Sequence, residues 1–165
     1  AFASLSQQAQ KAVAAEPNAA ELQIWNGIIL STYAGAKGGL GALGLVKQAK
    51  ASLEQGLALD PQALSGSAYT SLGSLYYQVP GWPVGFGDDE KAEAMLKQAL
   101  AINPDGIDPN YFYGDYLARA KRYEEARAAL EKALQAPARP NRLSADAGRK
   151  EEIATLLSKV KAELD

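Results

Sequence analysis

The sequence predicts an all-α protein, a solenoid of antiparallel helix pairs that forms one domain over residues 1–165. Helix-favouring residues dominate the composition, since 32 Ala and 21 Leu make up about a third of the chain. β-Branched residues, which favour strands, are few, with 6 Ile, 5 Val and 3 Thr. Apolar residues account for 47% of the chain, which is enough for a packed core. An internal repeat completes the argument and defines the helices.

Four segments of the chain end alike, with a short apolar run before or around a Pro. They are AVAAEP (12–17), GLALDP (56–61), ALAINP (99–104) and a weaker copy, ALQAPA (133–138). Pro61 and Pro104 are each preceded by Ala at 12 positions, Leu at eight and a small residue at five. Because Pro cannot donate a hydrogen bond and clashes with the preceding turn, each Pro marks the end of a helix.

A second pattern lies upstream of these runs, where a Gly follows one apolar residue and precedes another by three positions. Gly73 and Gly114 fit it well, and Gly27 fits it loosely. Small residues at these positions, with Ala92 and Ala126 on the following helices, allow two antiparallel helices to approach closely. The combined pattern resembles the tetratricopeptide repeat (TPR), whose helix pairs stack into a solenoid with one continuous core.

The repeat divides the chain into a partial repeat, three full repeats and a capping helix. The second helix of the partial repeat is expected at 4–16, the full repeats at 19–61, 65–104 and 108–138, and the capping helix at 144–164. The helix pairs are expected at 19–34 with 45–59, at 65–78 with 88–102 and at 108–120 with 123–136. The apolar side of the first helix, which includes Leu5, should be partly exposed. Ser144 or Asp146 is placed to cap the last helix.

Two insertions lengthen the same turn of two successive repeats. The regular repeat has 12 positions from Gly114 to Ala126, whereas the two earlier repeats have 22 (Gly27 to Ala49) and 19 (Gly73 to Ala92). Both inserted loops should therefore emerge on one edge of the solenoid. Insertions on one face often form a binding surface.

The first insertion, AGAKGGLGALGL (34–45), contains a formal GxGxxG sequence. Dinucleotide binding requires a strand before such a sequence, and a helix is expected here instead. We therefore expect a flexible Gly-rich turn with a short helical segment that contains Leu.

The second insertion, QVPGWPVGFGDD (78–89), is too rich in Pro and Gly for regular structure. Two interpretations remain open for its aromatic residues. Trp82 and Phe86 could pack under the loop and make it a rigid wall beside a groove, which is our main expectation. Alternatively, they form an aromatic platform for a partner. Asp88 or Gly87 should cap the helix that follows.

The resemblance to TPR proteins implies a concave groove lined by the first helix of each pair. The candidate groove residues are Ile28, Thr70, Ser74, Tyr77, Tyr111, Asp115 and Arg119. They include none of the Lys and Asn residues with which chaperone-binding TPRs hold a terminal carboxylate. Hydroxyl and aromatic groups dominate, which suits an apolar or mixed protein segment. Asp115 and Arg119 could instead form only an exposed ion pair.

Composition excludes most catalytic and cofactor chemistry. The chain has no His and no Cys, which removes His-based triads, thiol nucleophiles, disulfides and most transition-metal sites. Its net charge of −2 gives no basic footprint for nucleic acid. Asp105 and Asp108 lie in a Pro-Gly turn and are expected to form the turn and cap the next helix. We expect no cofactor, no metal and no enzyme, with a carboxylate-based enzyme as a distant alternative.

Charge is uneven along the second half of the chain. Residues 65–118 carry 2 basic and 7 acidic side chains, whereas residues 119–150 carry 9 basic and 4 acidic ones. This asymmetry could orient head-to-tail self-association, so a homo-oligomeric assembly module is the alternative to a scaffold for other proteins. The same charges could equally be solvated helix surface.

Three strings are more specific than the bare repeat: TYAGAKGGLGALGLVK, YYQVPGWPVGFGDDEKAE and NPDGIDPNYFYGDYL. They resemble bacterial TPR proteins of the TatT-like family, which are associated with tripartite ATP-independent periplasmic (TRAP) transporters. The resemblance implies a periplasmic, non-enzymatic, self-associating protein that partners a solute-binding protein. Absence of Cys suits an oxidising compartment, and the start at Ala1 fits a removed signal peptide, so a periplasmic or exported protein is expected, with the cytoplasm as alternative. No apolar run is long enough to span a membrane.

Overall fold

The computed structural model describes all 165 residues and contains eight α-helices, one short 3₁₀ helix and no β-strand. The predicted all-α class is therefore confirmed. Its contacts divide the chain into two compact units, residues 1–95 and 96–165, and the boundary falls inside helix α5 (Asp89–Ile102). That the two units form the single domain expected from the repeats stays a prediction. No helix combines the length and apolar character needed to cross a membrane.

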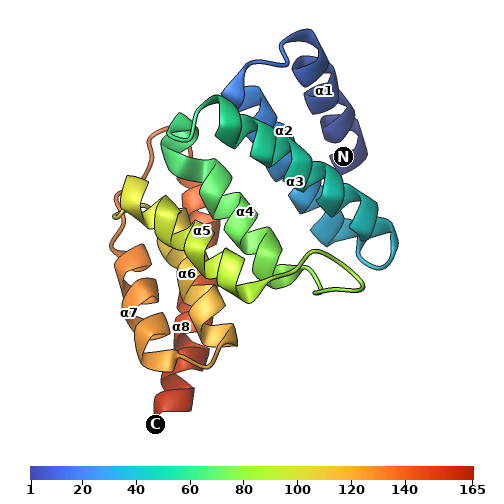
Figure 1. The fold of residues 1–165 in the computed structure, drawn as a ribbon. Helices are drawn as coiled ribbons and strands as arrows, with labels where there is room; N and C mark the ends of the chain where they lie inside the picture. Colours follow the sequence, from blue (N-terminus) through green and yellow to red (C-terminus); the bar gives the residue numbers. More distant parts are fainter. The chain divides into compact units, whose positions relative to one another are not determined.

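Unit 1 is built from helices that pack in chain order. Figure 1 shows α1, α2 and α3 lying side by side, with α4 against α3. The elements are α1 (Phe2–Ala15), α2 (Ala20–Lys37), α3 (Gly41–Leu59), the 3₁₀ helix η1 (Ala63–Gly66), α4 (Ser67–Gln78) and the start of α5. On the first helix, Leu5 is 44% exposed, which agrees with the expected partial exposure of its apolar side.

Glycines hold α2 and α3 close together, as the repeat pattern predicts. A Cβ atom on Gly27 would lie only 2.4 Å from Cγ of Leu53, and one on Gly56 would lie 2.7 Å from Cγ1 of Ile24. Both Leu53 and Ile24 are fully buried. The contact therefore depends on the absence of a side chain at both glycines.

The first insertion contains the expected Gly-rich turn, but most of it is helical, so the helix ends expected at residues 34 and 45 are wrong. α2 continues to Lys37 and α3 begins at Gly41, so only three residues connect them. Gly38 and Gly39 have φ angles of 65° and 64°, in the region that favours glycine and ends a helix. The Ala and Leu residues on either side of these glycines have high helix propensity, which explains why the helices extend into the insertion.

The second insertion remains a loop, and backbone hydrogen bonds fix both of its ends. The Gly87 N–H donates to the Pro80 carbonyl at 2.9 Å, and the Asp88 N–H donates to the Tyr76 carbonyl at 2.8 Å. A Cβ on Gly87 would lie 1.9 Å from the Val79 carbonyl oxygen, so glycine is required for this approach. The Asp88 side chain caps α5, as predicted, by accepting the Lys91 N–H at 3.0 Å.

Unit 2 continues with α6 (Ile107–Arg119), α7 (Tyr123–Leu134) and α8 (Leu143–Leu164). A Cβ on Gly114 would lie 2.7 Å from Cγ and Cδ2 of Leu130, which repeats the close approach found in unit 1. α8 packs mainly on α7 and buries one apolar face, whose members are Ile153, Leu157 and Val160. The sequence predicts this amphipathic helix at 144–164.

The expected side-chain cap of α8 is wrong for both candidates. Arg142 occupies the N-cap position, and no side chain forms a capping hydrogen bond. Asp146 is buried and accepts the backbone N–H of Arg139 at 2.8 Å. Its carboxylate also binds the Arg139 guanidinium, so this residue fixes the preceding linker instead of the helix end.

Candidate partner-binding site

The two insertions share one pocket in unit 1, with a volume of about 350 Å³. The turn between α2 and α3 forms one side and the loop after α4 forms the other, at the end of the hairpin that Figure 1 shows beside that loop. This confirms that both insertions emerge on one edge. The lining residues from the two insertions are Ala34, Gly35, Gly39, Leu40, Ala42, Leu43, Gln78, Val79, Pro80 and Val84.

Most residues that line the pocket are apolar. Its lining holds no charged residue, and Ser31 and Ser74 supply the only hydroxyl groups. Ser31 Oγ donates to the Gly27 carbonyl at 2.8 Å, and Ser74 Oγ donates to the Ser71 carbonyl at 2.8 Å. Both hydroxyl protons are used inside their own helices, and the Gln78 amide is the remaining polar side-chain group of the lining, so the pocket is suited mainly to apolar groups.

Large apolar side chains stand exposed around the pocket. Leu40 is 86% exposed and Val84 is 58% exposed, and both are lining residues. Trp82, two residues before Val84 in the same loop, is 91% exposed. Exposed apolar groups beside a cavity are typical of an interaction site.

The expectation that Trp82 packs under its loop is therefore wrong, and Phe86 performs that role. The Phe86 ring meets the Tyr76 ring edge to face, with centroids 5.6 Å apart. Phe86 directly precedes Gly87 and Asp88, whose N–H groups bind back to the loop and to α4. Trp82 lies within the turn that the Val84 N–H closes on the Gly81 carbonyl, and its ring is exposed instead of packed on a helix.

The candidate groove residues of unit 1 differ in exposure. Ser74 lines the pocket, whereas Ile28 and Tyr77 are half-buried. Thr70 is only 6% exposed and offers a partner almost no surface. The other candidates belong to unit 2, so a groove that joins all of them stays a prediction.

In unit 2 the candidates Tyr111, Asp115 and Arg119 all lie on α6. Arg119 Nε lies 3.3 Å from Asp115 Oδ2, so the ion pair weighed from the sequence does form. The Tyr111 ring is covered by the Arg149 guanidinium, 4.6 Å from its centroid. Burial raises the pKa of Tyr111 to about 12, and the nearby charge of Asp115 adds to the effect.

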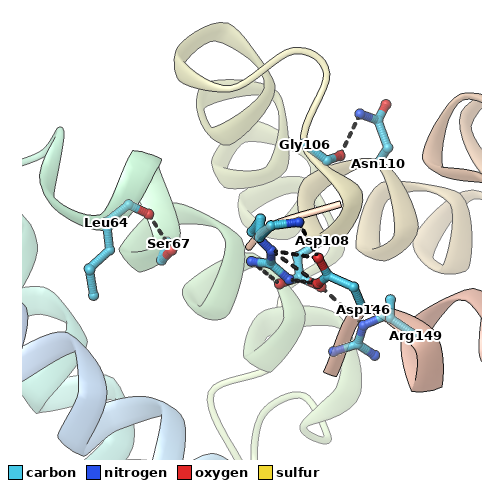
Figure 2. A network of polar contacts seen from close by, with 8 residues as sticks. Leu64, Ser67, Gly106, Asp108, Asn110, Asp146 and Arg149 are labelled. Carbon is cyan, nitrogen blue, oxygen red and sulfur yellow. Dashed lines mark hydrogen bonds and ion pairs between the residues drawn. The ribbon is translucent and has the colours of Figure 1, made fainter. Parts of the chain in front are cut away.

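Asp108 and Asp146 hold a network of ion pairs within unit 2 (Figure 2). Asp108 lies 3.3 Å from Arg139 and 3.1 Å from Arg149 through its two oxygens. Hydrogen bonding to Asp146 raises the pKa of Arg139, and the same contact lowers the pKa of Asp146. The expectation that Asp105 or Asp108 caps α6 is wrong, because Gly106 occupies the N-cap position and no side chain forms a capping hydrogen bond. Asp108 lies in the first turn of α6, and its carboxylate ties that turn to α8 and its linker.

Two residues near helix starts form hydrogen bonds that the sequence did not predict. Gln23 Nε2 donates to the Pro17 carbonyl at 3.0 Å, and Asn110 Nδ2 donates to the Pro104 carbonyl at 2.9 Å. Each amide stands six positions after a repeat Pro. That shared offset, with a carboxamide in both units, is the signal that could have identified them.

Only part of the acidic stretch is paired with the basic stretch. Besides the network around Asp108, Lys132 lies 3.7 Å from Asp105 and Arg119 lies 3.3 Å from Asp115. The other acidic residues of that stretch, Asp88, Asp89, Glu90 and Glu93, belong to unit 1. Head-to-tail association oriented by the charge asymmetry stays a prediction. No group of three or more carboxylates is close enough to hold a metal ion.

Comparison with known proteins agrees with this architecture. Residues 85–147 match the tetratricopeptide repeat family. A crystal structure of MamA has a similar fold, with a TM-score of 0.58, 21% sequence identity, and coverage of 98% of this chain and 87% of that one. A second crystal structure of MamA protein has a TM-score of 0.56 and 22% sequence identity, with coverage of 96% of this chain and 80% of that one. No curated protein sequence matches the chain.

These observations define the fold class. The fold is all-α and similar to that of a TPR solenoid, and residues 85–147 match the TPR family. Within that class, this chain is similar in fold to MamA and differs from a plain repeat by the apolar pocket between its two insertions.

Proposed function

We propose that this protein is a non-enzymatic scaffold that binds a segment of another protein at the pocket of unit 1. The observation that carries the proposal is an apolar cavity of about 350 Å³ with Leu40 and Val84 in its lining and Trp82 exposed on the same loop. Aromatic anchors next to a concave apolar surface are typical of the centres of protein interfaces. Ser74, one of the candidate groove residues, lines the pocket, which supports a pocket that continues the groove on which TPR proteins bind their partners.

The same pocket gives no support to the carboxylate-based enzyme. Its lining contains no Asp, Glu, Lys or Tyr, and its two Ser hydroxyls donate within their own helices. A nucleophile needs an adjacent base, and none of the lining residues can act as one.

Photo-crosslinking tests the proposal directly. A benzophenone amino acid in place of Trp82 should crosslink a protein partner in the native host, and the crosslink should disappear when Ala42→Trp fills the pocket. The same probe at Ala51, which is exposed on α3 and outside the pocket lining, is the matched control. Equal crosslinking from both positions, or crosslinking that survives Ala42→Trp, would contradict the proposal. A crosslinked dimer of this chain would support the homo-oligomeric module instead.

We also propose a periplasmic location and, as the partner, the solute-binding protein of a transporter. The support is the resemblance of the Gly-rich, Trp-containing and NPDGIDPN strings to TatT-like proteins, together with the absence of Cys. Fractionation of the native host should recover the protein in the periplasmic fraction, and the Trp82 probe should crosslink the solute-binding protein. Recovery in the cytoplasm would refute this part while leaving the scaffold proposal intact.

A further inference from the structure

The surroundings of the pocket carry charge of one sign. Between residues 22 and 53 the charged side chains are Lys37, Lys47 and Lys50, and between residues 61 and 87 there are none. Residues 22–53 of the α2–α3 hairpin and the loop as far as Gly87 therefore contribute cations and no carboxylate, and the first carboxylates beyond these segments are Glu21, Glu54, Asp60 and Asp88. A partner that docks here meets a positive rim around an apolar centre.

Two of these lysines flank the pocket. Cε of Lys37 lies 2.8 Å from the place where Gly41 would carry a Cβ, so this side chain runs over the turn that lines the pocket. Lys47 stands four positions after the lining residue Leu43 on α3, which puts both on the same side of the helix.

The same two lysines are not neutralised by the protein itself. Lys50 binds Glu54, and the hydrogen bond to that carboxylate raises the pKa of Lys50. Lys37 and Lys47 make no ion pair, and the Lys37 ammonium lies 5.9 Å from the centre of the Tyr33 ring. Their charge is available to a partner.

We infer that the bound segment is acidic, with a large apolar side chain in the pocket and Asp or Glu beside it against Lys37 and Lys47. This inference rests on the proposed function. Burial of the apolar side chain supplies most of the affinity, and the charges at the rim select the sequence and speed the encounter. An anionic bilayer would also meet exposed Trp82 and Leu40, but a bilayer surface has no protruding group to fill a concave cavity.

A displayed library of random 12-residue peptides, selected at low salt on this protein, provides the test. Peptides that also bind the Ala42→Trp variant are removed, so that the remaining ones require an open pocket. We expect Leu, Ile or Phe with Asp or Glu close by. The selected peptide is then made with its acidic residues changed to Gln and to Lys, and its affinity is measured by fluorescence anisotropy.

The charge variants give the second arm of the test. Lys37→Glu with Lys47→Glu should weaken binding of the acidic peptide roughly 2- to 30-fold, as expected for two exposed ion pairs, and should favour the Lys peptide. Lys11→Glu, an exposed lysine on α1 outside the pocket lining, should change nothing. Selection of neutral or basic peptides that still need the open pocket would overturn the charge inference alone.

If the proposed function itself is wrong, the peptide experiment should give a different result. In that case no selected peptide would distinguish the parent from Ala42→Trp or from Trp82→Ala, the second variant, whose exposed side chain is not needed for folding. Sedimentation with phosphatidylglycerol vesicles that depends on Trp82, without any peptide binding, would overturn both proposals in favour of a membrane surface.

Discussion

The lengthened hairpin α2–α3 and the regular hairpin α6–α7 have the same packing and different ends. Both pairs share one close approach of a Gly to a Leu, Gly27 to Leu53 and Gly114 to Leu130, and α2–α3 adds the approach of Gly56 to Ile24. Yet α2 and α3 have 18 and 19 residues, whereas α6 and α7 have 13 and 12. The insertion has added length beyond the packing contact without changing the contact itself.

The turns of the two hairpins show what the added length allows. The regular hairpin turns through Lys121, which adopts a φ of 61° although it is not Gly. The lengthened hairpin turns through Gly38 and Gly39, and the turn forms one wall of a pocket. A repeat can therefore acquire a pocket wall at its far end while the packing contact between Gly and Leu is kept.

The largest expected effect is on the shared packing contact. Gly27→Leu and Gly114→Leu should each destabilise the protein by about 3 kcal/mol, because the new side chain must enter space filled by Leu53 or Leu130. Urea unfolding measures the loss. Gly148→Ala on α8, where no atom lies within 4 Å of the new Cβ, is the control and should gain roughly 0.5–1 kcal/mol. A neutral result at Gly27 alone would break the equivalence of the two hairpins.

Asp146→Asn should have the next largest effect, and it concerns only the regular hairpin's unit. The variant weakens the contacts of a buried carboxylate with Arg139, at a cost of about 1–3 kcal/mol near neutral pH.

The same contact makes a pH prediction. Because its folded-state pKa is lowered, Asp146 contributes stability above its unfolded pKa of about 4, and this is lost as the pH falls through the folded value. The difference between parent and Asp146→Asn should therefore be constant from pH 7 to pH 5 and shrink below pH 4. A difference that persists at pH 2 would show that the loss comes from packing.

A smaller and matched effect is expected at the helix starts. Gln23→Ala and Asn110→Ala should each cost about 1–2 kcal/mol, since each removes the hydrogen bond to a repeat Pro carbonyl and one more, from the Ser52 hydroxyl to Gln23 or from Asn110 to the Gly106 carbonyl. Thermal melts of the two variants would compare the hairpins at equivalent positions. Unequal losses would show that one unit relies on its helix start more than the other.

Local signals made most of the fold predictable. A Pro such as Pro104 ends a helix through its own geometry, and a Gly such as Gly114 marks the packing contact within a few residues of the chain. The same local reasoning overestimated how many residues the glycines of the first insertion would keep out of a helix, because only Gly38 and Gly39 interrupt the helices there. Flanking Ala and Leu residues keep the rest helical.

The candidate site was less predictable because it depends on contacts between distant segments. That both insertions share one edge follows from repeat register, and the pocket confirms it. Which aromatic residue packs does not follow from composition. It depends on where the loop is fastened, and the bonds at Gly87 and Asp88 hold Phe86 against Tyr76 and leave Trp82 outside.

The smallest expected effect on stability is at Trp82 in the loop. Phe86 in the same loop should show a larger one. Trp82→Ala should change the free energy of unfolding by less than about 0.5 kcal/mol, as for other surface substitutions, because the side chain is 91% exposed. Phe86→Ala should cost about 1–2 kcal/mol, less than the ~3–5 kcal/mol of a fully buried ring, because Phe86 is half-buried against Tyr76.

Fluorescence measures the exposure of the Trp82 ring independently of the stability of the protein. In a Trp25→Phe background, Trp82 emission should be red and readily quenched by acrylamide, since its ring is in contact with water. Addition of the selected acidic peptide should shift the emission to the blue and protect it from quenching. A blue, protected signal in the free protein, together with a stability loss in Trp82→Ala, would show that the ring packs on its own unit. The α2–α3 hairpin and the loop after α4 would then pack against each other and leave no open site for a partner. The added length of this hairpin, compared with α6–α7, would then serve packing and not binding.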